Sequence, residues 1–318
     1  MYHGIAESGS DPWSLCVSPR HFAEHLEVLQ NLGRPMRLQE LTQNLREGSI
    51  PHRAVAVTFD DGYANNLHNA KPLLERYDIP ATIFLATGYI GSQREFWWDE
   101  LDRLLLQPGR LPETLRLKVN GGTYRWELGE MAYYSEDNYR RDRNRKAWEG
   151  GPGSRYSLYY SLWQLLRPLR EEERRITLDE ILTWTGVEPV TRPTHRALLA
   201  EEVCMLGEGS LIEIGAHTVT HPFLSMHSAN FQWDEIQRSK AHLGDLIGQP
   251  VMSFAYPHGD YTKGTVALVR KAGFTCACST IADTVWRLTD EFELPRFEVH
   301  NWNGEEFARQ LSRAFATQ

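Results

Sequence analysis

Two adjacent aspartates, Asp60 and Asp61, follow the short apolar run Val55 to Phe59. Such a run predicts a buried strand, and the two carboxylates come where that strand should end and a loop begin. Because side chains alternate between the faces of a strand, both carboxylates reach one pocket only if the chain turns, which Gly62 permits. Two close carboxylates in an apolar setting repel, so a cation or hydrogen-bond donors must stabilise both negative charges. The sequence therefore predicts a metal site.

A pair of histidines in the later segment Ile212 to Pro222 provides candidate ligands. His217 and His221 are spaced so that both rings can bind one ion, either from a helical turn or from a curled loop. The apolar residues before them and the proline after them favour the loop. A histidine pair alone is more often a surface feature, but the paired aspartates shift the balance to a metal site. One aspartate with two histidines leaves positions for water and substrate, as catalytic metal sites do.

A third segment, Phe254 to Gly259, has the form Phe-x-Tyr-Pro-x-Gly. Together with Thr58–Tyr63 and His217–His221, in this order, it resembles the three motifs of the polysaccharide deacetylases, the family of chitooligosaccharide deacetylase with its NodB homology domain. The opening Tyr2 to Ile5 is similar to the Tyr-His-x-Ile start of a branch that acts on exopolysaccharides and cell-surface glycans. The resemblance covers residues 1–91 and 211 to about 300.

The resemblance implies a role for each motif residue. Asp61, His217 and His221 would bind a divalent metal, Zn²⁺ or a similar ion, and Asp60 would be the general base that accepts a proton from the attacking water. Such an ion lowers the pKa of bound water towards roughly 7 and polarises the carbonyl under attack. A backbone N–H near Tyr256 would stabilise the oxyanion of the tetrahedral intermediate.

An amine leaving group must be protonated before the carbon–nitrogen bond breaks, so the reaction also needs an acid. In the branch with the Tyr-His opening, the resemblance implies that this acid is His3, on the first strand. His300 follows the last strand-like run and is the alternative, although it could equally be a solvated loop residue. His258 stands where many relatives carry an aromatic residue and could only shape the pocket.

One position departs from the family pattern. Ala255 stands where many members carry an arginine that orients the catalytic aspartate through a charge-assisted pair. Arg296 is the candidate replacement, because a cation at the end of a neighbouring strand can reach Asp60. The alternative is a surface arginine whose stem covers apolar neighbours.

Composition favours a globular enzyme. The chain has 318 residues, 41% of them hydrophobic, and a net charge of −8, which gives no electrostatic case for binding nucleic acid. Apolar stretches of about 18 residues are absent, so no membrane span is predicted, and Met1 to Asp11 lacks a signal-peptide pattern, which predicts a cytoplasmic chain. Four cysteines form no paired framework and are expected to be reduced core residues, with a Cys-x-Cys metal site as the minor alternative: Cys16, Cys204, Cys276 and Cys278.

Strand and helix patterns alternate along the chain. The first helix should begin after Ser18, with Pro19 at its first position, and end at Gly33. Strands are predicted at 54–59, 81–86, 211–216, 251–256 and 274–279, and helices at 66–77, about 233–247 and 265–272. Such βαβ units form parallel sheets. The candidate residues follow the ends of several strands, which favours a barrel over an open sheet, and the resemblance implies an α/β fold, a distorted (β/α)7 barrel.

Residues 93–195 have no counterpart in the minimal family domain, and we expect them to form a mainly helical insertion within a single catalytic domain spanning 1–318. Helices are predicted over 95–106, 156–169 and 170–184. Several aromatics there could stack on sugar rings, although each is more often a core residue: Trp97, Trp98, Tyr133, Tyr134, Trp148 and Trp163.

The sequence thus predicts a metal-dependent carbohydrate deacetylase. Its substrate would be an N-acetylated sugar or oligosaccharide of a bacterial surface glycan or its precursor, from which it removes an N-acyl group, foremost acetyl. An O-acetyl esterase or a non-sugar amidase on the same site is the alternative. A non-catalytic glycan-binding protein is a further one, which the complete set of Asp60, Asp61, His217 and His221 argues against.

Overall fold

A computed structural model describes residues 1–316; the last two positions of the expected 1–318 domain lie outside the described part. The chain divides into two compact units. Unit 1 comprises residues 1–7, 15–92 and those from 197 onward, and it contains all the candidate site residues. Unit 2 comprises residues 8–14 and 93–196, and therefore contains the segment that we expect to be an insertion together with a short piece of the N-terminal region.

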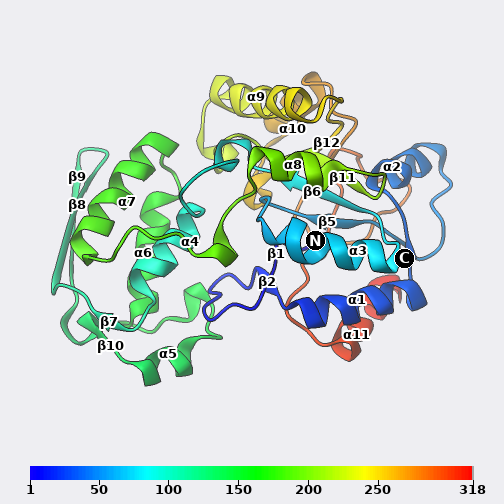
Figure 1. The fold of residues 1–318 in the computed structure, drawn as a ribbon. Helices are drawn as coiled ribbons and strands as arrows, with labels where there is room; N and C mark the ends of the chain where they lie inside the picture. The colour runs from blue at the N-terminus through cyan, green and yellow to red at the C-terminus, as the bar shows by residue number, and fades with distance from the viewer. Residues whose placement is uncertain (317–318) are drawn as a thin grey trace. The chain divides into compact units, whose positions relative to one another are not determined.

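A parallel five-stranded sheet lies at the centre of unit 1 (Figure 1). Its strands, in spatial order, are β13 (Cys276–Cys278), β12 (Ser253–Ala255), β11 (Ile212–Ala216), β6 (Ala81–Leu85) and β5 (Val57–Phe59). The register pairs Ile214 with Ile83, and both side chains are buried. Because buried parallel strands are apolar on both faces, these short hydrophobic runs suit the sheet's interior position.

Two further segments extend this sheet and join each other. Tyr2 pairs in parallel with Phe59, and Leu294 pairs in parallel with Cys278. The N–H of Val299 donates to the carbonyl of Met1 at 3.0 Å, which connects these two outer segments. Seven chain segments therefore follow one another around unit 1, and the expected distorted (β/α)7 barrel is confirmed.

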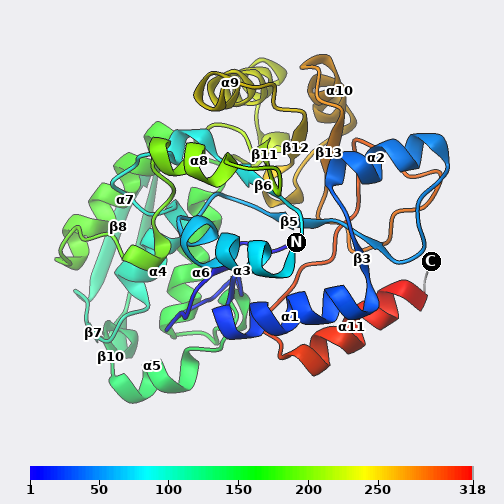
Figure 2. The same ribbon diagram turned by 45° about the vertical axis from the view of Figure 1, so that its right-hand side comes forward.

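Helices surround the sheet of unit 1 (Figures 1 and 2). They are α1 (Pro19–Leu32), α2 (Leu38–Glu47), α3 (Lys71–Tyr77), α8 (Ala200–Gly207), α9 (Ala229–Ile247), α10 (Lys263–Lys271) and α11 (Gly304–Ala316). Helix α1 begins and ends as predicted, because the Ser18 hydroxyl accepts the N–H of His21 and Gly33 follows the last helical residue. Helices α1 and α11 lie side by side in both views.

Three local features differ from the predicted elements. The predicted strand 54–59 is two strands, because β4 (Ala54–Val55) pairs with β3 (Arg34–Pro35) while β5 pairs with β6. The predicted helix 66–77 starts with a π-helical turn at Asn66–Ala70 before α3 begins. Near the N-terminus, β1 (Gly4–Ile5) pairs with β2 (Cys16–Val17).

Unit 2 contains the predicted helices as α4 (Trp97–Leu105), α6 (Arg155–Leu166) and α7 (Glu171–Thr185), together with the short α5 (Glu136–Asp142). It also contains two antiparallel pairs that the sequence analysis did not predict, β8 (Thr114–Val119) with β9 (Gly122–Glu127) and β7 (Gly109–Arg110) with β10 (Tyr133–Tyr134). Asn120 and Gly121 form the turn of the first pair and both have positive φ, so an Asn-Gly hairpin signal was present and overlooked.

The aromatic residues of unit 2 separate into two groups. Trp97, Trp98, Tyr134 and Trp163 are buried, and Trp97 stacks on Trp163 with 6.0 Å between ring centroids. Tyr133 and Trp148 are exposed, at 62% and 56%. The buried four therefore belong to the core of this unit.

Within residues 1–316, no helix has the length and apolar character needed to cross a lipid bilayer.

Candidate metal centre

The two aspartates leave the strand where the chain turns sharply. Strand β5 ends at Phe59, and Asp61 and Gly62 both adopt left-handed backbone conformations, with φ of 76° and 89°. A Cβ atom at position 62 would lie 2.6 Å from Leu85 Cδ2 and would be strained at this positive φ, so glycine is favoured there. This turn breaks the alternation of the strand, so that Asp60 and Asp61 do not point to opposite faces of a regular sheet.

The Asp61 carboxylate lies against two imidazole rings. Its Oδ1 atom is 3.1 Å from His221 Nε2 and 3.5 Å from His217 Nε2, and the two Nε2 atoms are 3.1 Å apart. All three side chains are buried. Burial alone would raise the pKa of Asp61, but its contacts with the His217 and His221 rings hold that pKa well below its ordinary value. The cluster therefore keeps an anionic oxygen beside two ring nitrogens.

The His217 ring is oriented by the backbone of the third motif. Its Nδ1 atom lies 2.7 Å from the carbonyl oxygen of Ala255, at the end of β12. Because a carbonyl only accepts, Nδ1 donates this hydrogen bond, and Nε2 keeps its lone pair for a ligand. Metal-binding histidines are commonly held in this way by an outer hydrogen-bond partner. The position where many relatives carry an arginine thus contributes a backbone group here.

The two histidines lie on a loop, as predicted. Strand β11 ends at Ala216, and residues 217–223 form no helix. Thr218 and His221 have positive φ, at 65° and 53°, and the Thr218 hydroxyl accepts the N–H of His221 at 3.1 Å. This tight turn brings the Nε2 atoms of His217 and His221 close together, although the two residues are four positions apart in the sequence.

The donor set fits a divalent metal. One carboxylate oxygen and two imidazole nitrogens lie within 4.8 Å of one another, and they match the ligand types that Zn²⁺ takes in catalytic sites with an open position. In residues 1–316 this is the one group of three or more such side chains whose ligand atoms come so close. Cys276 and Cys278 are buried free thiols in β13, as expected for core residues, and burial raises the pKa of the Cys278 thiol to about 12. Cys16 is half-buried and Cys204 is exposed, so the expectation of four core cysteines is wrong for these two.

The Asp60 carboxylate forms a bidentate pair with Arg296. Arg296 Nη1 donates to Asp60 Oδ1 at 2.7 Å, and Nη2 donates to Oδ2 at 2.8 Å. The guanidinium is itself buried and held by the Ser279 carbonyl, which accepts from Nε at 2.8 Å. Burial would raise the pKa of Asp60, but the charge of Arg296 holds that pKa below its ordinary value. Of the two alternatives for Arg296, the structure places it against the aspartate rather than on the surface.

The candidate acids differ in their surroundings. His3 is partly buried and close enough for its charge to lower the pKa of both Asp60 and Asp61. His300 lies edge-on to Trp302, with ring centroids 5.2 Å apart. His258 stacks on Phe223 with ring centroids 3.9 Å apart and lies edge-on to His221 at 4.3 Å, so it borders the candidate metal centre.

The oxyanion donor expected near Tyr256 stays a prediction, and the groups of Tyr256 itself are already engaged. Its backbone N–H donates to the carbonyl of Cys278 at 3.2 Å, as part of the sheet. Its side chain is fully buried, and the hydroxyl donates to the Phe292 carbonyl at 2.9 Å. Pro257 has no N–H, so a donor from this loop would have to come from His258 or beyond.

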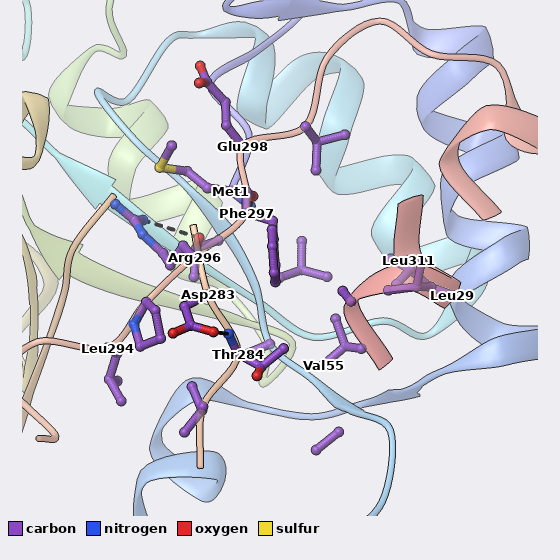
Figure 3. A pocket seen from close by; sticks show the side chains of 18 of the residues that line it. Met1, Leu29, Val55, Asp283, Thr284, Leu294, Arg296, Phe297, Glu298 and Leu311 are labelled. Carbon is purple, nitrogen blue, oxygen red and sulfur yellow. Dashed lines mark hydrogen bonds between the residues drawn. The ribbon is translucent and has the colours of Figure 1, made fainter. Parts of the chain in front are cut away.

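A separate cavity of about 370 Å³ lies within unit 1, lined mainly by apolar side chains (Figure 3). Arg296 and Leu294 border one side of it, and Leu29 and Leu311 lie on the other. The cluster of Asp61 with the two histidines is not among its lining residues. We therefore do not place the reacting groups in this cavity.

The sequence analysis missed two contributors to the site. The Ala255 carbonyl has no signature in residue type, because every residue carries one. Glu235, which binds the loop between the two histidines, could have been identified from the helical pattern of the sequence. It lies on the face of α9 that also carries the buried Ile236, Ser239 and Leu243, where an unpaired glutamate would be unfavourable.

Comparisons with known proteins agree with this geometry. The unit 1 fold with its Asp–His–His cluster defines a βα-barrel protein with a candidate catalytic metal centre. Residues 47–116 and 194–277 match the polysaccharide deacetylase family model, and these segments include Asp60, Asp61, His217 and His221. These two segments, just under half of the chain, are thus similar to the polysaccharide deacetylase domain.

Individual relatives are similar over parts of the chain. A putative polysaccharide deacetylase of Bacillus subtilis, YxkH, is 31% identical over 137 residues, which are 42% of this chain and 47% of that protein. A poly-beta-1,6-N-acetyl-D-glucosamine N-deacetylase of Staphylococcus aureus (strain MSSA476) is 38% identical over 78 residues, which are 24% of this chain and 27% of that protein. The chain thus spans less than half the length of these relatives.

Solved structures are similar over nearly the whole chain. IcaB from Ammonifex degensii has a TM-score of 0.59 at 19% identity, covering 99% of this chain and 94% of that one. The Streptococcus pyogenes deacetylase PplD, in complex with acetate, has a TM-score of 0.56 at 17% identity, covering 98% and 96%. At this level of identity the likeness establishes the fold.

Proposed function

We propose that this protein is a metal-dependent carbohydrate deacetylase that removes the N-acetyl group from a sugar of a bacterial surface glycan or its precursor. The observation that carries the proposal is the buried cluster of Asp61, His217 and His221 beside an arginine-paired Asp60. The family match supports a polysaccharide substrate. The Staphylococcus aureus relative, named for an N-acetyl-D-glucosamine polymer, supports an N-acetylated sugar.

Asp61, His217 and His221 would hold the metal, Zn²⁺ by its donor set. When bound there, the ion would supply Lewis acidity and lower the pKa of a coordinated water. Asp60 would act as the general base, because Arg296 keeps its carboxylate ionised and fixes both oxygens. A general base needs this fixed orientation towards the proton that it accepts.

His3 is the proposed acid that protonates the leaving amine. Its support is its place in the Tyr-His opening, together with its partial burial near both aspartates. Protonation of the nitrogen is needed for an amide but far less for an ester with a good leaving group. The role of His3 therefore distinguishes amide from ester chemistry.

The paired Asp60 also bears on the alternative of a non-catalytic glycan-binding protein. The absence of the family arginine at Ala255 favours that alternative. Arg296 provides the charge-assisted pair from another segment, so the aspartate is oriented without a residue at position 255.

The test is acetate release from N-acetylglucosamine oligomers by the Zn²⁺-loaded protein. We expect release that stops on removal of the metal with a chelator and returns when Zn²⁺ is restored. O-acetylated sugars and an aryl acetate serve as comparison substrates under the same conditions. Release from the O-acetyl substrates alone would replace the proposal with an esterase, and metal binding without any hydrolysis would favour a glycan-binding protein.

A further inference from the structure

We propose that Glu235 of α9 is a positioning residue for the metal centre, holding the turn between His217 and His221 in the shape that lets both rings bind one ion. This inference rests on the proposed metal site, and it adds a determinant of metal affinity that lies outside the three motifs.

Three hydrogen bonds connect Glu235 to the turn. Its Oε2 atom accepts the backbone N–H of Val219 at 2.9 Å and that of Thr220 at 2.7 Å. Its Oε1 atom accepts the Thr220 hydroxyl at 2.9 Å. The Glu235 side chain is buried, and the three bonds are partly shielded from bulk water. A carboxylate that accepts two consecutive backbone N–H groups fixes the path of the chain between them.

The turn needs such support because its backbone is strained. Thr218 and His221 both have positive φ, a conformation that non-glycine residues adopt only when the surrounding structure requires it. Left without Glu235, the N–H groups of Val219 and Thr220 would lose their acceptors at a partly buried site. Unsatisfied buried donors are unfavourable, so the turn would rearrange to find other partners.

The opposite side of the turn is held by the chain after β6. The N–H of Thr87 donates to the Thr218 carbonyl at 3.0 Å, and the N–H of Gly88 donates to the Val219 carbonyl at 2.8 Å. A Cβ atom at position 88 would lie 2.7 Å from that carbonyl oxygen, so glycine allows the close approach. Hydrogen bonds therefore hold the turn at its carbonyl groups through this segment and at its N–H groups through Glu235. His217 precedes the held residues in the chain and His221 follows them.

This arrangement predicts a specific effect on metal binding. The two Nε2 atoms are 3.1 Å apart only because the turn reverses the chain within four residues. Loss of the Glu235 contacts should let the two rings move apart. Removal of outer partners of metal ligands typically weakens metal affinity by roughly 10–100-fold.

The experiment measures the Kd of Zn²⁺ for the metal-free protein by competition with a chromophoric chelator. Glu235→Ala should raise the Kd by about 10–100-fold. Gln232→Ala is the matched control, because Gln232 lies one turn earlier on α9, is equally buried at 6%, and binds Thr265 and His227 instead of the turn. That control should leave the Kd unchanged even where it lowers the thermal stability.

The conservative variant Glu235→Gln tests whether the metal affinity depends on the hydrogen bonds of Glu235 rather than on its charge or on the stability of the protein. Its amide oxygen can accept both N–H groups while its NH₂ group donates to the Thr220 hydroxyl, so it should restore most of the affinity. Should Glu235→Ala fail to fold, Thr220→Val removes one of the three hydrogen bonds and should raise the Kd by a smaller factor.

Two results would overturn the proposal: wild-type Kd values in Glu235→Ala and Thr220→Val, or an equal loss in Gln232→Ala. A wild-type protein that binds no Zn²⁺ would contradict both this inference and the proposed metal site. Tight Zn²⁺ binding without acetate release would contradict the proposed function alone, since the Kd comparison does not depend on turnover.

Discussion

Both units of the protein bury charged side chains, but they satisfy these charges differently. In unit 2, Arg192 donates from Nη1 to Asp102 at 2.6 Å and from Nη2 to Glu95 at 2.8 Å. The second oxygen of Asp102 accepts the Ser10 hydroxyl at 2.6 Å. Each buried carboxylate there has a guanidinium partner, so the network is closed within the protein and holds the unit together.

In unit 1, the two buried aspartates have different partners. Asp60 has a bidentate arginine, Arg296, and in this respect resembles the acids of unit 2. Asp61 instead faces His217 and His221, with ligand atoms of all three directed to one place. Residue burial alone therefore does not distinguish a structural charge network from a reaction centre. The two cases differ in whether the carboxylate oxygens are already paired with an arginine of the protein or remain available to bind a metal ion.

The largest effect should come from removing a ligand of the proposed ion. Asp61→Ala, His217→Ala and His221→Ala should each lose most of the bound metal, beyond the roughly 10–100-fold affinity change of an outer-partner variant, and nearly all activity. Metal content by elemental analysis is the measurement. Asp102→Asn in unit 2 is the control, because it breaks a closed network and should lower stability while the metal stays bound. Full metal occupancy in all three variants would refute the ligand assignment.

A second prediction concerns the proposed acid, for which unit 2 has no equivalent. His3→Ala should depress hydrolysis of an N-acetyl sugar by roughly 10²-fold or more, while an activated aryl acetate is hydrolysed nearly as before, because its leaving group needs no proton. His300→Ala should affect both substrates only mildly. Equal losses on both substrates in His3→Ala would indicate a structural role, and a selective loss in His300→Ala would move the acid to that residue.

A third prediction compares the arginines that pair with buried carboxylates in the two units. Removing one partner of a buried ion pair costs about 3–5 kcal/mol, so Arg296→Met and Arg192→Met should both lower the free energy of unfolding in urea by amounts of this order. Only Arg296→Met should also lower kcat at a temperature where both variants are folded, because Arg296 orients Asp60. An unchanged kcat in Arg296→Met would show that Asp60 does not need this partner.

The smallest effect is a pH dependence that both units should share. Burial lowers the pKa of His25 in unit 1 and of His195 in unit 2 to about 4. The unfolded chain binds more protons between pH 6.5 and about 4, so the stability from each neutral ring is complete above pH 6.5 and is lost as the pH falls towards 4. Each ring contributes up to about 3 kcal/mol on this scale.

Urea unfolding of the metal-free protein between pH 7.5 and 4.5 measures this dependence. His25→Gln should flatten the part of the profile that belongs to unit 1 and leave the part that belongs to unit 2. A wild-type unfolding free energy that does not fall below pH 6.5 would contradict the assignment of two buried neutral histidines.

Much of unit 1 could be predicted from the sequence because its signals are local. Ser18, Pro19 and Gly33 delimit α1 through capping chemistry, and the apolar runs that become β6, β11 and β12 are short and bounded by loops. The first two motifs placed the aspartates and histidines correctly after strand ends. The pairing of β4 with β3 could not be predicted, because strand partners depend on contacts between distant segments.

The sequence could not show which backbone and side-chain groups are already hydrogen-bonded to other parts of the protein. The N–H of Tyr256 belongs to the sheet, and the Ala255 carbonyl orients His217, but neither fact is encoded in a residue type. Arg296 was a candidate with two equal interpretations until its distance to Asp60 was known. In unit 2, the Asn120–Gly121 turn was readable and was overlooked among helical patterns.

The most direct test of the account is the metal content and turnover of Asp60→Asn, measured together. The two adjacent aspartates are assigned different roles, base and ligand, although they differ by one position in the chain. We expect Asp60→Asn to retain the divalent ion at the wild-type level and to release acetate roughly 10²-fold more slowly or worse, the usual scale for removal of a general base. Loss of the metal with Asp60, while Asp61→Asn keeps it, would reverse the two roles and contradict the account.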